Sequence, residues 1–161
     1  MTTQTFAPWV EPIAAKLRDS RAEIVAVARA VPSEAWGRSS PLEGWTYKDL
    51  LAHLADPGAQ LAVLRAAADN QPVDASAFGD LDARNERRRK EREGHSIEQL
   101  VTEVEAAGEE LQYLLTRLTE ADANRRVDDV PLALGDRLRF LTNHDRGHLP
   151  QLREALEENK A

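Results

Sequence analysis

Residues 96–118 read SIEQLVTEVEAAGEELQYLLTRL and carry the clearest helical pattern in the chain. Along this stretch apolar side chains return every three or four positions, as they do on the buried face of an amphipathic α-helix. The apolar positions are Ile97, Leu100, Val101, Val104, Leu111, Leu114, Leu115 and Leu118. Ser96 and Gln99 have the spacing of a capping box, which begins a helix. The pattern predicts a long helix from Ser96 to about Leu118.

Three other segments have the same periodicity. The first covers residues 8–31, and the last covers residues 135–158. Between them, residues 46–69 form another amphipathic stretch. Pro57 lies inside that stretch and removes one backbone hydrogen bond, so we expect a kink or a break after Asp56. Four long amphipathic segments predict an all-α protein built as a four-helix bundle.

The connection between the second and third long helices is the least regular part of the sequence. Residues 71–79 are expected to form a loop. Residues 80–93 are very polar and are interpreted as a short helix in solvent. A basic run there could bind phosphates, but glutamates interleave with its members Arg84, Arg87, Arg88, Arg89, Lys90 and Arg92. Two-residue alternation is confined to residues 127–134, a segment too isolated to form a sheet.

The composition is that of an ordinary globular protein, and residues 1–161 are interpreted as a single domain. The net charge of −7 argues against general nucleic-acid binding. Cysteine is absent, which excludes a disulfide framework, a thiolate metal site and a cysteine nucleophile. No apolar stretch is long enough to cross a bilayer, and the N-terminus lacks a signal pattern, so we expect a cytoplasmic protein.

Three histidines carry the sharpest functional signal. His144 and His148 lie four residues apart in the last predicted helix, so their side chains return to one face, one turn apart. His53 lies in the apolar second helix. Burying three imidazoles together is costly unless each stays neutral and finds a partner, and a divalent cation removes that cost. The histidines therefore predict a metal site with open coordination positions, whereas His95, in a polar loop, is excluded as a ligand.

The residues alone leave other interpretations open. His144 and His148 could be partly buried and satisfied by hydrogen bonds, and His53 could be a packed core residue. Acid–base catalysis without metal has less support, because the sequence has neither a G-x-S-x-G segment nor an H-E-x-x-H pattern. No catalytic residue is therefore assigned. The tryptophans are interpreted as core residues, with Trp45 as the exception that we expect near a substrate.

Residues 44–54, GWTYKDLLAHL, followed much later by residues 144–151, HDRGHLPQ, resemble the DinB-like family. Its superfamily includes the metal-binding domain of mycothiol-dependent maleylpyruvate isomerase and the bacillithiol transferases. The resemblance covers nearly the whole chain and implies a four-helix bundle of the DinB-like type. It also implies that a divalent metal is held by His53, His144 and His148. Asn85 matches a position that would line the same cleft, and Gln151 matches a late polar position that would support the metal ligands. Both are candidate cofactor-binding residues.

The resemblance implies a function as well. Members of known chemistry are thiol-dependent transferases or isomerases, so the implied activity is that of a metal-dependent thiol S-transferase acting on small electrophilic molecules. Zinc or nickel is the expected metal. Since the chain has no cysteine, the sulfur would come from a low-molecular-weight thiol. The expected partners are this thiol, a small-molecule substrate and a second copy in a homodimer, but no nucleic acid or membrane. The alternatives are a non-catalytic metal- or ligand-binding bundle, and a bundle with vestigial histidines that associates with itself or with a partner.

Overall fold

The structure, a computed structural model, describes residues 3–69, 80–126 and 133–157. Within these residues it is helical, with no strand beyond a single bridge between Ser39 and Thr46. The elements in chain order are α1 (Glu11–Ala30), η1 (Ser33–Ala35), α2 (Tyr47–Ala55), α3 (Ala59–Asp69), α4 (Leu81–Glu91), α5 (Ile97–Leu115), η3 (Glu120–Asp122) and α6 (Leu134–Glu157). The predicted all-α class is confirmed. The expected loop 71–79 and residues 127–132 of the alternating segment lie outside the described residues.

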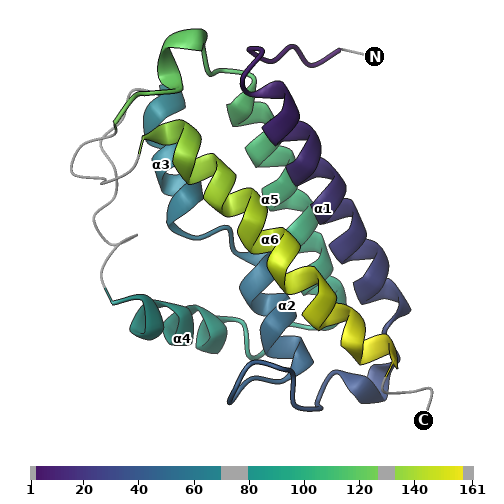
Figure 1. Cartoon of the computed structure of the whole chain (residues 1–161). Helices are drawn as coiled ribbons and strands as arrows, with labels where there is room; N and C mark the ends of the chain where they lie inside the picture. The colour runs from purple at the N-terminus through teal and green to yellow at the C-terminus, as the bar shows by residue number, and fades with distance from the viewer. Residues whose placement is uncertain (1–2, 70–79, 127–132, 158–161) are drawn as a thin grey trace.

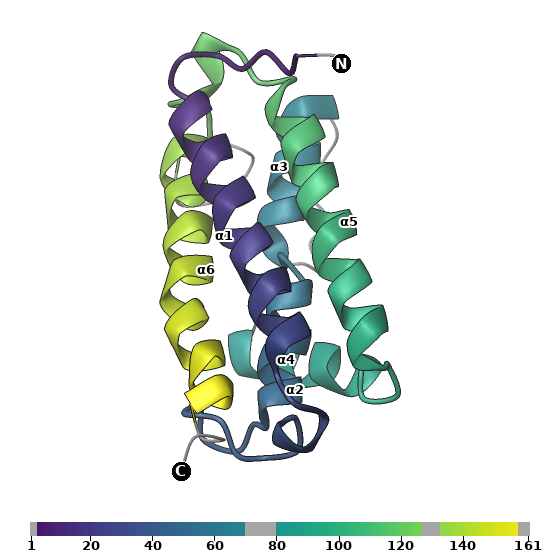
Figure 2. The same cartoon turned by 90° about the vertical axis from the view of Figure 1, so that its right-hand side faces the viewer.

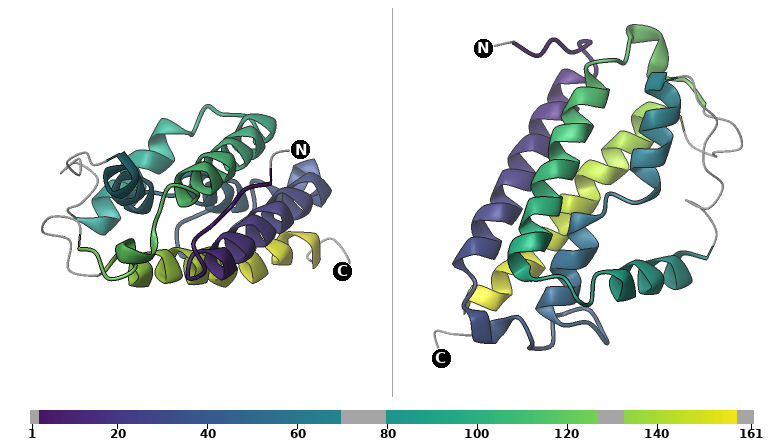
Figure 3. Two further views of the ribbon diagram at one scale, coloured as in Figure 1. Left: turned by 90° about the horizontal axis from the view of Figure 1, so that it is seen from above. Right: turned by 180° about the vertical axis from the view of Figure 1, so that it is seen from behind.

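The three longest helices and a broken fourth form the bundle (Figure 1). The helices α1, α5 and α6 run along its length, and α1 packs against both α5 and α6 (Figure 2). The short helices α2 and α3 follow one another on the remaining side and together take the place of the fourth long helix. The helix α4 lies outside this bundle, next to α2 (Figure 3). The predicted four-helix bundle with a short helix in its long connection therefore describes the fold.

Capping boxes fix the starts of two of these helices. The Thr46 side chain accepts a hydrogen bond from the backbone N–H of Asp49, and the Asp49 carboxylate accepts one from the backbone N–H of Thr46. Ser96 and Gln99 form the same reciprocal pair at the start of α5. Each pair satisfies backbone N–H groups that the first helical turn leaves without partners. The local sequence therefore determines where α2 and α5 begin.

The second helical segment breaks at the position predicted from Pro57. The helix α2 ends at Ala55, Asp56 is extended, and α3 begins at Ala59. Gly58 has a φ of 67°, a left-handed conformation that glycine adopts without strain. Its backbone N–H donates a hydrogen bond of 2.8 Å to Oδ1 of Asp56. The break therefore leaves the Asp56 carboxylate at the side of the bundle where α4 lies.

Apolar side chains form two buried clusters, one toward each end of the bundle. One combines the C-terminal halves of α1 and α6 with α2 and the start of α5. The other combines the N-terminal halves of α1 and α6 with α3 and the end of α5. Between the clusters lie the buried polar residues of the described chain, which we call the polar layer: Ser20, Arg21, Thr142 and Asp145.

An ion pair joins α1 to α6 within the polar layer. Nε of Arg21 lies 3.2 Å from Oδ2 of Asp145, and the contact is held by charge because its angles are not those of a hydrogen bond. Asp145 follows His144 in α6, so the polar layer continues directly into the candidate functional site.

Each long helix has one buried apolar face and one charged outer face. Among the described parts of the chain, no helix combines the length and the apolar character that crossing a membrane requires.

Candidate metal centre

The structure brings His53, His144 and His148 together, although His53 comes from α2 and the others from α6. The Nε2 atoms of His53 and His144 are 2.9 Å apart. Each of the three rings offers a nitrogen within 4.8 Å of the other two. The centres of the His144 and His148 rings are 4.5 Å apart, and those of His53 and His148 are 5.1 Å apart. The residues predicted as metal ligands therefore form one histidine cluster.

The histidine cluster has the dimensions of a divalent-cation site. Zinc–imidazole bonds of about 2.0–2.1 Å in a tetrahedral arrangement place neighbouring nitrogens roughly 3.3 Å apart. The separation of 2.9 Å between His53 and His144 is close to this value. The ligand nitrogens of the three rings lie within 4.8 Å of one another, so a small inward movement of the side chains would bring all three to a cation. Three imidazole nitrogens suit zinc or nickel. The residues present therefore fit a cation that keeps coordination positions for another ligand.

Burial favours the neutral form of His53 and His148, which is the form that binds a cation. Burial, followed by the proximity of His144 and His148, lowers the pKa of His53 from 6.5 to about 3. Burial also lowers the pKa of His148, in opposition to a hydrogen bond with Gln151 that raises it. A neutral imidazole keeps a nitrogen lone pair for a metal, whereas an imidazolium does not. His53 is therefore neutral at pH 7 and able to act as a ligand.

Gln151 holds the ring of His148 from one turn further along α6. Its Oε1 lies 2.6 Å from Nδ1 of His148. Because an amide oxygen accepts, Nδ1 donates its hydrogen and Nε2 keeps its lone pair. Metal-ligating histidines are commonly fixed in this way by a hydrogen bond to the second ring nitrogen. Gln151 therefore contacts the histidine cluster rather than open solvent.

Asp145 brings a buried carboxylate to the other side of the histidine cluster. Its Oδ1 lies 3.6 Å from Nδ1 of His144, a distance at which the two groups interact through charge and not through a hydrogen bond. Asp145 also pairs with Arg21 of α1. Asp145 was not among the residues predicted for the site. Its signal would have been an acidic side chain beside a histidine within an amphipathic helix.

The histidine cluster lines a cavity of about 500 Å³ between α4, α6 and the α2–α3 break. Such a volume is typical of sites for small molecules. The Trp45 ring also lines the cavity, and its centre is 5.1 Å from that of His53. Asn85 lies on the α4 wall of the same cavity. The exposed side chains of Leu81 and Phe140 complete an apolar part of its lining.

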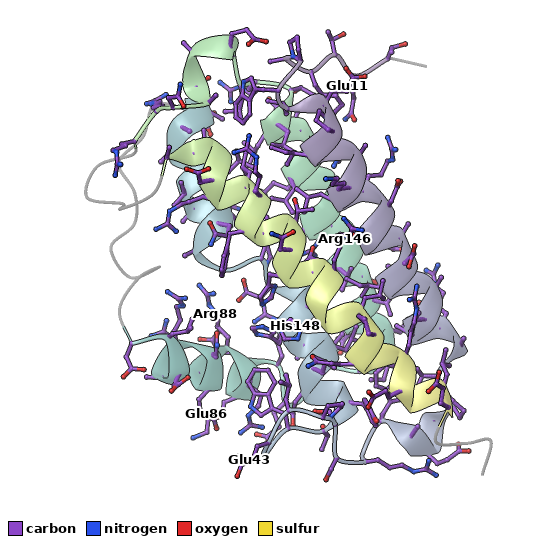
Figure 4. The ribbon with its side chains drawn as sticks, viewed as in Figure 1. Glu11, Glu43, Glu86, Arg88, Arg146 and His148 are labelled. Carbon is purple, nitrogen blue, oxygen red and sulfur yellow. The ribbon has the colours of Figure 1, made fainter. Side chains whose placement is uncertain are left out.

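The prediction that residues 80–93 form a helix in solvent needs correction. The helix α4 has no buried residue, but Arg84, Arg88 and Arg89 line the cavity. Arg88 projects from α4 toward the region that His148 faces from α6 (Figure 4). Nε of Arg88 lies 3.1 Å from Oδ2 of Asp56, at the α2–α3 break. One face of α4 is therefore docked on the bundle, and that docking forms a basic wall of the cavity.

His95 lies apart from the histidine cluster. Its Nδ1 is 2.6 Å from Oε1 of Glu103 on α5, and His95 does not line the cavity. The structure thus separates the fourth histidine from the three that meet.

The fold and the site together define the class of protein: a four-helix bundle with a three-histidine cluster in a small-molecule cavity. The model of the DinB superfamily matches residues 16–152. The chain therefore belongs to the DinB superfamily.

Two solved structures show the same fold. The mycothiol-dependent maleylpyruvate isomerase matches with a TM-score of 0.74 and 20% sequence identity, over 94% of this chain and 63% of the isomerase chain. The present chain thus spans less than two thirds of that enzyme. An uncharacterised protein from Escherichia coli UTI89 matches with a TM-score of 0.77 and 17% identity, over 99% of this chain and 96% of its own. No curated protein sequence matches the chain.

Proposed function

We propose that the protein is a metal-dependent enzyme that adds a low-molecular-weight thiol to a small electrophilic molecule. His53, His144 and His148 are the proposed ligands of a zinc or nickel ion. The observation that carries the proposal is the meeting of three imidazoles on the wall of a cavity large enough for a small molecule. The likeness in fold to an isomerase that depends on mycothiol supports the choice of a thiol as co-substrate.

The side chains around the cavity have distinct roles in this chemistry. A bound divalent cation supplies positive charge that lowers the pKa of a coordinated thiol, so that a thiolate is present near neutral pH. Gln151 holds the His148 ring so that Nε2 remains available. Trp45 and Phe140 provide apolar surface for the carbon skeleton of the electrophile. The Asn85 amide, on the wall opposite α6, is proposed to hydrogen-bond the thiol or the electrophile.

The metal content of the purified protein tests the ligand assignment. The protein is purified with a tag that does not bind metal, and zinc and nickel are measured by mass spectrometry. We expect near-equimolar metal in the wild type and a large loss in His144→Ala. His95→Ala is the matched control and should keep the wild-type content, because His95 lies outside the histidine cluster. Equal metal content in wild type and His144→Ala would contradict the assignment.

Conjugation of small thiols to an aryl halide tests the activity. We expect the wild-type protein to accelerate sulfur–carbon bond formation, with loss of the halide and of the thiol proton, and His144→Ala to abolish the acceleration. His95→Ala should be as active as the wild type. Metal binding without any acceleration, across thiols and electrophiles, would instead support a non-catalytic metal- or ligand-binding bundle.

A further inference from the structure

Two exposed apolar side chains line the cavity that holds the histidine cluster. Large hydrophobic side chains are exposed at three positions of the described chain: Leu81 at 57%, Tyr113 at 58% and Phe140 at 58%. Two of the three, Leu81 and Phe140, line this cavity from different helices. Single exposed apolar residues are common on protein surfaces, but their grouping around one concave site is typical of a place that binds an apolar ligand. Leu81 and Phe140 therefore provide apolar surface that the fold itself does not bury.

Phe140 lies beside the histidine cluster on α6. It precedes His144 by four residues, so the two side chains are neighbours on one face of the helix, about 6 Å apart along its axis. Leu81 is the first residue of α4, at the end of this helix that lies away from α2 (Figure 1). A molecule that fills the cavity from the histidine cluster outward therefore passes Phe140 first and extends toward Leu81.

The charged side chains of the cavity do not require an ionic ligand. Among the described residues, three acidic and three basic side chains line it. On the α4 wall, Arg88 lies 3.1 Å from Asp56, and Arg89 lies 2.6 Å from Glu86. An anion would have to compete with these carboxylates for the two guanidinium groups. A neutral ligand with an apolar substituent leaves the ion pairs in place and covers the exposed apolar surface.

We propose that the protein selects electrophiles with an apolar alkyl or aryl substituent, which Phe140 and Leu81 cover while the reacting carbon lies at the histidine cluster. This inference rests on the proposed function, because the substituent belongs to the electrophile of that reaction. Covering a methylene group completely increases affinity about fourfold, and covering it on one side increases affinity about twofold. The affinity should therefore rise with the length of the substituent.

Calorimetric titration of the purified protein with 4-methylnitrobenzene and with 4-butylnitrobenzene tests the inference. These relatives of an aryl halide lack the halide, and their binding requires neither a thiol nor a metal. The butyl compound has three more methylene groups, so we expect wild type to bind it at least about eightfold more tightly. This ratio should fall to about threefold in Phe140→Ser and in Leu81→Ser, and it should approach one in the double variant. Circular dichroism checks that the variants keep the helical fold.

Tyr113 supplies the matched control. It is as exposed as Phe140, but it lies on α5 and does not line the cavity. Tyr113→Ser removes a comparable side chain and should keep the wild-type ratio. The inference is overturned if Tyr113→Ser lowers the ratio as much as the cavity variants do, or if either cavity variant keeps it. Sedimentation velocity tests another occupant: an oligomer that Phe140→Ser and Leu81→Ser dissociate would show that a second copy covers these side chains, and would also overturn the inference.

The conjugation assay separates this inference from the proposed function. It compares two nitro-substituted aryl chlorides, one with a methyl and one with a butyl substituent. If neither is conjugated but the binding ratio persists and requires Phe140, the proposed function fails and the apolar site remains. If both are conjugated with equal kcat/KM and the two nitrobenzenes bind equally, this inference fails alone. A higher kcat/KM for the butyl compound that is lost in Phe140→Ser supports both.

Discussion

Replacing Asp145 with leucine removes the carboxylate that lies 3.2 Å from Arg21 in the polar layer. Asp145 is 0% exposed and Arg21 is 4% exposed, so the remaining guanidinium stays buried between the two apolar clusters. Breaking a buried ion pair in this way costs about 3–5 kcal/mol, because the other charge is left without compensation. For a domain of this size we therefore expect Tm to fall by roughly 6–20 °C.

Urea unfolding followed by circular dichroism measures this cost in a double-mutant cycle. The four proteins are the wild type, Asp145→Leu, Arg21→Met and the double variant. We expect each single variant to lose about 3–5 kcal/mol of unfolding free energy, and the double variant to recover most of that loss. Recovery is expected because methionine and leucine at these positions would extend the apolar clusters on either side.

An exposed ion pair on the same helix α1 is the control. Arg29 and Glu105 lie 3.0 Å apart, but their side chains are 55% and 44% exposed. Arg29→Met should therefore cost at most about 1 kcal/mol. The reasoning is refuted if the Arg21 and Asp145 single variants lose no more than this control. It is also refuted if the double variant loses the sum of the two single losses.

Three further changes test other parts of the site. The pKa of His53 is lowered from 6.5 to about 3, so the metal-free folded protein binds fewer protons than the unfolded chain between these values. Its free energy of unfolding in urea should fall as the pH is lowered through this range, and the fall should be smaller in His53→Phe. The same pH dependence in both proteins would contradict a buried neutral His53 ring. Gln151→Leu removes the hydrogen bond that holds the His148 ring, so the zinc affinity measured by calorimetry should fall about 10–100-fold. An unchanged affinity would contradict the orienting role of this hydrogen bond. Gly58→Ala imposes a left-handed φ on alanine and places a Cβ 2.8 Å from the Arg88 guanidinium. Amide hydrogen exchange along α4 should then become faster, and the free energy of unfolding should fall by about 1–2 kcal/mol. No change in either quantity would contradict the view that the α2–α3 break positions α4.

The bundle could be predicted because its evidence is local. Each apolar stripe repeats within one segment, and the Thr46–Asp49 and Ser96–Gln99 pairs form over a single turn. Pro57 acts on its own helix, so the break after Asp56 also follows from neighbouring residues. None of these features depends on how the helices pack.

The site could be predicted only in part. The spacing of His144 and His148 is a local property of one helix, but His53 joins them through the packing of α2 against α6. The cost of burying three imidazoles and the family resemblance predicted that contact, which the local pattern of neither helix contains. The contact of α4 with the cavity was not predicted, because α4 has no apolar stripe. The helix is held by the ion pair between Arg88 and Asp56, and Asp56 lies in a distant segment of the chain. A pattern of hydrophobicity carries no information about such a contact.

The polar layer also restricts how the helices can align. If α1 slid along α6 by one helical turn, about 5.4 Å, Arg21 would lie level with Leu141 or Leu149 instead of Asp145. That misaligned bundle would bury two separated charges and would be strongly disfavoured. The ion pair therefore favours one register of α1 against α6 as the bundle assembles. In this register His53 of α2 lies level with His144 and His148 of α6.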